Sequence, residues 1–183
     1  MGTKIIILFT VNFNNFFKAQ KQFYCFFVHW LKFEIMHTFI HYIHILGIMI
    51  LMGSLIAEYL IAKIKITKES IRMLSIANSI FLISLVVILI SGLFRWFIFG
   101  KGNDFYMTNP FFHTKLTLYI ILAILAFFPG GKIKKWKNQL NHDSSFQIAE
   151  KEVKSLFLLF RIEFLLMIII PLLAVLVARG TVA

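Results

Sequence analysis

The stretch SIANSIFLISLVVILISGLFRWFIF, residues 75–99, decides the fold class of this chain. Arg95, close to its end, is its only Lys, Arg, Asp or Glu. A helix of this length rises about 37 Å, which is enough to cross the roughly 30 Å hydrocarbon core of a bilayer. The stretch therefore predicts a membrane-spanning helix.

Further apolar stretches predict three more spans, at residues 37–61, 112–128 and 156–178. The span at 112–128 is near the lower limit of about 17 residues, and Pro129-Gly130-Gly131 is expected to end it, because these residues continue a helix poorly. Residues 147–155 predict a short interfacial extension of the last span. The predicted fold class is all-α, an integral membrane four-helix bundle.

Composition agrees with a membrane location. The chain is 60% hydrophobic, with 22 Phe, and only 15% charged, which is well above the apolar share of an ordinary soluble domain. The net charge of +11 would suit a nucleic-acid binder only if the basic residues gathered on one soluble face. They lie instead in short clusters between apolar runs, so composition argues against a soluble enzyme and against nucleic-acid binding.

Cys25 is the only cysteine in the chain. An intramolecular disulfide, a CxxC metal or redox motif, and covalent haem attachment through CxxCH are therefore excluded.

The N-terminal part differs from the rest. Residues 1–35 carry no clear hydrophobic period, and the apolar run at 5–17 is too short to span a bilayer. We divide the chain into residues 1–35, a poorly defined N-terminal extension, and residues 36–183, a four-helix transmembrane domain. Because the first convincing span follows Met36 directly, we expect the functional protein to begin there.

Basic residues predict the orientation. Loops 62–74 and 129–155 hold ten Lys and Arg side chains, against four on the opposite side of the bundle. Loops rich in Lys and Arg stay in the cytoplasm. We therefore expect both loops to be cytoplasmic, in a bacterial inner membrane, with Trp96 in an outer aromatic belt and Trp136 in an inner one.

Ionisable side chains at membrane depth are costly, so each is a functional candidate. His37, His41 and His44 share a face of the first span, and Arg95, His113 and Lys115 lie near the same end of the second and third spans. Together these residues predict an outer cluster. His41 and Lys115 also suit the interface, where side chains reach the headgroups. His44 is deeper, and is either a ligand or a hydrogen-bonded core residue.

A second group lies toward the cytoplasmic side. It comprises Glu58, Asn78, Arg161 and Glu163. We expect Arg161 to offset one or both carboxylates, more in the manner of a structural ion pair than of a proton relay.

Three segments resemble a known family. They are GLFRWFIFGKGNDFYMTNPFFHTKL (92–116), HILGIMILMGSLIAEYL (44–60) and EFLLMIIIPLLAVLVARG (163–180). Residues 36–183 are similar, in the same order, to the bacterial predicted membrane proteins called domain of unknown function 2214. That family has no activity to carry over, and its pattern has an Asp where this chain has Asn78. The resemblance implies roles for the matching residues Glu58, Arg95, Lys101, Gly102, Tyr106, Asn109, Lys115, Glu163 and Arg179.

A weaker resemblance concerns His44 and the HTKL segment at 113–116, which look similar to motifs of the HemJ-type protoporphyrinogen oxidases. It implies haem or porphyrin binding, with His44 as an axial ligand to the iron of haem b. Lys115 and Arg95 would then pair with the propionates, and a membrane redox partner is expected.

Two other functions remain open. In the first, the polar clusters serve only to join the helices of a non-enzymatic membrane subunit or assembly factor. A small transporter using Glu58 and Glu163 is the least favoured function, since no internal repeat is detectable. Whether the chain is an enzyme does not follow from its sequence.

Overall fold

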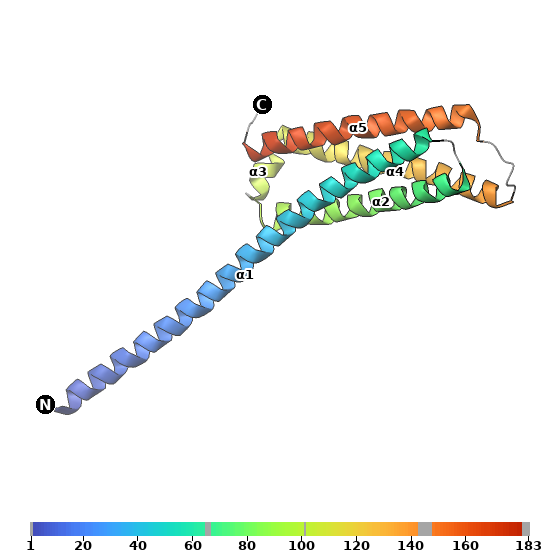
Figure 1. Ribbon diagram of the computed structural model, residues 1–183. Coiled ribbons are helices and arrows are strands. Elements are labelled where there is room, and N and C mark those ends of the chain that lie inside the picture. The colour runs from blue at the N-terminus through green and yellow to red at the C-terminus, as the bar shows by residue number, and fades with distance from the viewer. Residues whose placement is uncertain (1, 65–66, 101, 143–147, 181–183) are drawn as a thin grey trace. The chain divides into compact units, whose positions relative to one another are not determined.

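The computed structural model describes residues 2–64, 67–100, 102–142 and 148–180, and these ranges contain helices and no strand. Lys65, Lys101 and residues 143–147 lie outside the described residues. The helices, labelled in Figure 1, are α1 (Gly2–Lys63), α2 (Lys68–Phe97), α3 (Asn103–Met107), α4 (Pro110–His142) and α5 (Glu150–Ala178).

The chain forms two compact units, Met1–Ile40 and His41–Ala183. Helix α1 contributes to both, because it begins at Gly2 and not near residue 37 as the hydrophobic pattern predicted. A helix needs only local bonds from each N–H to the carbonyl four residues earlier. A stretch without a clear apolar face can therefore still be helical, and the side-chain pattern does not reveal where such a helix starts.

The second unit is a bundle. From His41 onward, α1 contacts α2 through side-chain hydrogen bonds and α5 through Tyr59, whose ring meets those of Phe157 and Phe164. Helices α2, α4 and α5 run alongside (Figure 1). The core includes large fully buried side chains from each long helix, among them Leu55, Phe81, Leu122, Trp136 and Phe160.

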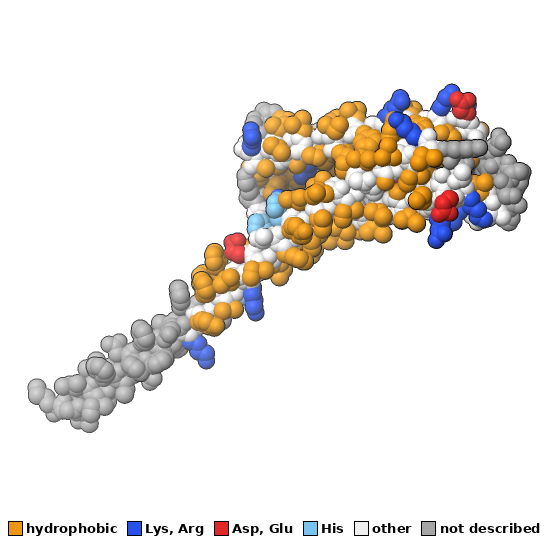
Figure 2. All heavy atoms as spheres, viewed as in Figure 1, with side chains coloured by type: hydrophobic (Ala, Val, Ile, Leu, Met, Phe, Trp, Pro, Cys, Tyr) orange, Lys and Arg blue, Asp and Glu red, His pale blue; other side chains and the backbone are white. Residues whose placement is uncertain are grey.

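The outer surface of the bundle is apolar. Ile83 on α2 and Ile168 on α5 are each 64% exposed, and hydrophobic side chains cover the visible side of the bundle in Figure 2. Lys, Arg, Asp and Glu gather toward the end that carries the α1–α2 and α4–α5 connections. Within the described residues, four helices are long and apolar enough to cross a membrane: Phe26–Lys63, Lys68–Phe97, Pro110–Asn141 and Glu150–Ala178. The predicted all-α membrane bundle is confirmed.

Helix α4 passes through Pro129-Gly130-Gly131 and ends at His142, so the prediction that these residues end the third span is wrong. Much of the supposed loop 129–155 is therefore helical. Pro129 has no N–H to donate to the carbonyl of Leu125, but one missing bond inside a packed helix can be tolerated. Gly130 is explained by packing, since a Cβ there would lie 2.7 Å from Asn78 Oδ1.

The connection between α2 and α4 holds the short helix α3, which the sequence did not predict. Gly102 precedes it with φ of +96°, a conformation that glycine adopts at little cost. Asn109 then accepts hydrogen bonds from the N–H groups of Phe111 and Phe112. This cap fixes the start of α4 and hence the position of Lys115, about one and a half turns further on.

The last helix begins at Glu150, in agreement with the predicted extension of the fourth span ahead of residue 156. Its first turn carries two acidic residues, Glu150 and Glu152, which suit the positive end of a helix dipole.

Candidate functional site: a pocket beside His44

A pocket of about 130 Å³ lies among α1, α2, α4 and α5. We call it the His44 pocket. Its walls are mostly apolar, and its polar members include His44 from α1, Lys115 and Tyr119 from α4, and Trp96 from α2. Figure 2 shows a hollow in this part of the bundle, bordered by histidine, with a basic side chain inside it.

The hydrogen bonds of His44 favour one tautomer. Its Nδ1 lies 2.9 Å from Ser91 Oγ, and Ser91 Oγ lies within donating distance of the carbonyl of Val87, at 2.7 Å. A hydroxyl has one proton, so when Ser91 donates to Val87 it accepts from His44, and Nδ1 then carries the imidazole hydrogen. In the neutral ring Nε2 then keeps its lone pair, which is the arrangement of a histidine that binds a metal or accepts a proton.

Gly92 lies beside this ring. A Cβ at residue 92 would lie 3.4 Å from His44 Cε1, in ordinary van der Waals contact, and Gly92 itself lines the pocket. On α2, Ser91 therefore bonds the imidazole, and Gly92 forms the pocket wall next to it.

Positive charge lies at the same level. Lys115 is half-buried, and its Nζ is 5.6 Å from the centre of the Phe112 ring, within the range of a cation–π contact. Arg95 does not line the pocket, but it is close enough to act electrostatically on His44 and Lys115. The His44 pocket thus combines apolar walls with positive charge, a combination that attracts an acidic group on an apolar molecule.

Trp96 adds a hydrogen-bond donor. Its ring stacks on Phe97 and meets Phe112 edge-on, with centroids 4.5 and 4.9 Å away. Its Nε1 is buried with no hydrogen-bond partner. The sequence suggested Trp96 only for an aromatic belt, and its place in the wall was missed. Trp96 and Gly92 both belong to the segment 92–116, which resembles the family, and this was the signal that could have found it.

Helix α5 closes the pocket with Met167 and Pro171. Pro171 has no N–H to donate to the carbonyl of Met167. Tyr119 faces the pocket as an apolar ring, since its hydroxyl donates to the carbonyl of Leu85.

The other predicted members of the outer cluster lie elsewhere. His41 is exposed and does not line the pocket. His113 is exposed, and its Nε2 lies 2.8 Å from the carbonyl of Met107, so it joins α4 to α3. Among the described residues no group of three or more His, Cys, Asp or Glu side chains is placed to hold a metal ion.

The second predicted group comes together in part. Glu58 and Glu163 are both fully buried and Asn78 nearly so, and Asn78 Nδ2 donates to Glu58 Oε1 at 3.4 Å. We call these three residues the Glu58 cluster. Arg161 is exposed, so the expectation that it offsets the carboxylates is wrong. Residues two apart on a helix point about 200° apart, so Arg161 faces outward where Glu163 faces inward.

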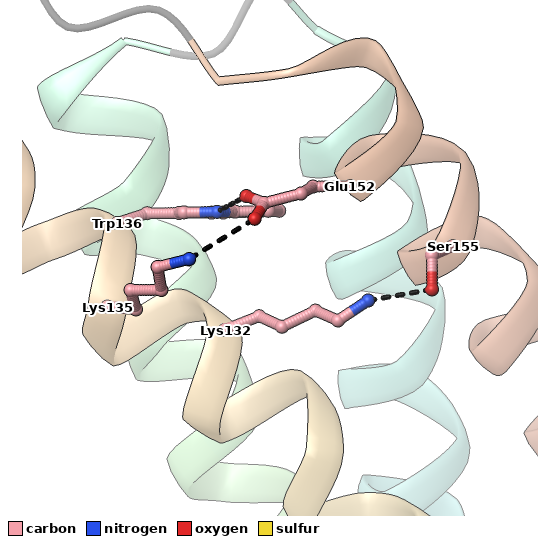
Figure 3. A network of polar contacts seen from close by, with 5 residues as sticks. All are labelled: Lys132, Lys135, Trp136, Glu152 and Ser155. Carbon is pink, nitrogen blue, oxygen red and sulfur yellow. Dashed lines mark hydrogen bonds and ion pairs between the residues drawn. The ribbon is translucent and has the colours of Figure 1, made fainter.

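Beyond this cluster, a polar network joins α4 to α5 (Figure 3). Trp136 Nε1 donates to Glu152 Oε2 at 2.6 Å, Lys135 pairs with Glu152 at 3.3 Å, and Lys132 donates to Ser155 at 2.8 Å. Trp136 is fully buried, so its assignment to an aromatic belt at the membrane surface is wrong.

In the part of the chain that the structure describes, four helices of spanning length define an α-helical integral membrane protein with a pocket among its helices. The chain belongs to the family described as predicted membrane protein (DUF2214), whose model matches residues 36–182. No curated protein and no solved structure matches the chain. None of these comparisons supports the similarity to the HemJ-type oxidases.

Proposed function

We propose that this membrane protein binds a flat, mostly apolar molecule with an acidic group in the His44 pocket. The observation that carries the proposal is that His44 and Lys115 line the same pocket. An imidazole from α1 and an ammonium from α4 line one otherwise apolar pocket. The lone pair on His44 Nε2 would face the ring system, and Lys115 would pair with the acid, with Arg95 adding positive charge nearby.

A porphyrin or haem b is the particular ligand that the sequence resemblance favours. The side chains suit it, because an imidazole held through Nδ1 is a normal iron ligand. The volume of the pocket limits how much of a porphyrin can enter. A cavity of roughly 150 Å³ takes a molecule the size of benzene, and the His44 pocket measures about 130 Å³. One pyrrole ring of the macrocycle fits, and the helices must move apart to admit the rest of it. Haem, when bound, would supply one-electron redox chemistry, with a membrane redox partner.

A non-enzymatic subunit or assembly factor is the second candidate. The bond between His44 and Ser91 favours it, because it already satisfies one side of the buried imidazole. In that case the polar residues stabilise helix contacts and bind nothing.

The test is a titration of the purified full-length chain in detergent with haemin and with metal-free protoporphyrin. We expect haemin to give a shifted Soret band that His44→Ala removes. Lys115→Ala should weaken binding of both porphyrins about ten- to a hundredfold, the loss expected for a charge-assisted hydrogen bond of about 1.5–3 kcal/mol.

His113→Ala and Lys134→Ala are the matched controls, since both side chains are exposed and outside the pocket. They should bind as the parent does. If neither porphyrin binds, the porphyrin proposal fails. If haemin binds and His44→Ala leaves the spectrum unchanged, the assignment of His44 fails.

We also propose the location and the orientation. The protein would lie in a bacterial inner membrane, with the segments at 62–74 and 129–155 in the cytoplasm. The excess of Lys and Arg in these segments supports this orientation.

A further inference from the structure

The Glu58 cluster places two carboxyl groups inside the bundle, and within the described ranges no Lys or Arg forms an ion pair with either of them. Glu58 and Glu163 are each 0% exposed. Three of their four oxygens, Glu58 Oε2 and both of Glu163, are buried with no hydrogen-bond partner. An unpaired buried charge costs far more than an unpaired neutral group, so two bare carboxylates could not persist here.

The two side chains lie at the same level of neighbouring helices. The residues that follow them, Tyr59 on α1 and Phe164 on α5, have their rings 5.9 Å apart. Glu163 is close enough to act electrostatically on Glu58. Two negative charges on neighbouring helices repel strongly in a medium of low dielectric constant. Only one of the two carboxyl groups can therefore readily be ionised.

The basic side chains of the surrounding helices point elsewhere. Lys63 lies over the Tyr59 ring, 4.8 Å from its centre, and Lys132 donates to Ser155. Two others are exposed, Arg72 on α2 and Arg161 on α5. The neutral amide of Asn78 is the hydrogen-bond partner of Glu58. Its Oδ1 is turned toward Gly130, where a Cβ would lie 2.7 Å away.

We propose that Glu58 and Glu163 hold one proton between them and form a proton-binding site inside the membrane. The proton is covalently bound to one of the two carboxyl groups, and the other group carries the remaining negative charge. Glu58 Oε1 accepts from Asn78, which leaves Glu58 Oε2 and the two Glu163 oxygens to take the proton. One proton removes the repulsion of two adjacent anions, as in other pairs of carboxyl groups that share a proton. A proton also needs no cavity, whereas a hard metal cation takes six or more oxygen ligands.

The site is independent of the ligand proposed for the His44 pocket. Glu58 lies 14 residues after His44 on α1, about 21 Å along the helix. It is only about 8 Å from the end of the helix at Lys63. The proton therefore has a short path to water at that end of the bundle.

Infrared spectroscopy of the full-length protein tests the site directly, because a protonated carboxyl has its own carbonyl-stretching band. Glutamate labelled with ¹³C at the side-chain carboxyl shifts this band and leaves aspartate bands in place. We expect one protonated glutamate at neutral pH, with a band that shifts in D₂O. Glu58→Gln and Glu163→Gln should each keep a band of undiminished intensity at an altered frequency, since the remaining buried carboxyl keeps the proton. The double variant should lose it.

Glu69→Gln is the control, because Glu69 is exposed in the first turn of α2 and should leave the band unchanged. Labelling of the unaltered protein gives the protonation state even if a variant does not fold. A band that survives in the folded double variant would overturn the proposal. Single variants with half the intensity would mean that each carboxyl holds its own proton. The absence of any such band, with a thermal midpoint that rises in sodium chloride but not in choline chloride, would assign the site to a sodium ion.

Discussion

Gly130 and Gly131 are neighbours in α4, and their surroundings differ. A Cβ at residue 130 would lie 2.7 Å from Asn78 Oδ1, whereas one at residue 131 would meet nothing within 4 Å. Asn78 has little freedom to move away, because its amide group bonds Glu58. The two glycines therefore have different roles: at position 130 a side chain would contact Asn78, whereas at position 131 it would not.

We predict that Gly130→Ala is less stable than Gly131→Ala by about 1–3 kcal/mol, the usual cost of overpacking. The gain in helix propensity, up to about 1 kcal/mol, applies to both and cancels in the comparison. Unfolding in mixed micelles, followed by circular dichroism, measures the difference. Equal stabilities would mean that Asn78 yields without cost and that Gly130 has no packing role.

At the scale of elements, α4 is the helix in which local signals and tertiary contacts disagree. Its segment after Pro129 carries exposed lysines, but Ile133 and Trp136 from the same turns are fully buried. The Trp136 contact with Glu152 ties this segment to the first turn of α5. The helix continues past Pro129, Gly130 and Gly131 because Ile133 and Trp136 are packed inside the bundle.

We therefore predict that Trp136→Ala destabilises the protein by about 3–5 kcal/mol, as for other large aromatic side chains removed from a core. Trp136→Phe should cost less, since it keeps the ring and loses only the N–H. Equilibrium unfolding checks both, with the exposed Lys134→Ala as the control that should leave stability unchanged. If Trp136→Ala resembles Lys134→Ala, the segment does not depend on its packing against α5.

At the scale of the whole molecule, the orientation in the membrane is a prediction from charge alone. The single cysteine makes it accessible to labelling: Cys25→Ser removes the only thiol, and cysteines can then be placed singly at exposed positions. Lys68→Cys, Asn103→Cys and Lys137→Cys are suitable, because all three side chains are exposed.

We expect a membrane-impermeant maleimide to label only Asn103→Cys in intact cells, and all three variants after lysis. The physical reason is that the segments rich in Lys and Arg around residues 68 and 137 remain on the cytoplasmic side. Labelling at Lys137→Cys in intact cells would reverse the orientation.

The sequence by itself determined the class of the protein and the residues to consider. Runs of apolar residues long enough to cross a bilayer can hardly be stable in water, so four spans followed from hydropathy alone. The cost of burying polar groups singled out His44, Lys115, Glu58, Asn78 and Glu163, and the structure brings them together in two places.

Only the tertiary structure decided which face each helix turns inward and where each helix ends. Arg161 and Glu163 differ by about 200° around α5, but sequence alone does not tell which of them is buried. The passage of α4 through Pro129 and the place of Trp96 in a pocket wall depend likewise on neighbours distant in the chain. Hydropathy reflects the free energy of transferring a whole segment from water into the bilayer. The direction in which each side chain points is set instead by packing against other helices.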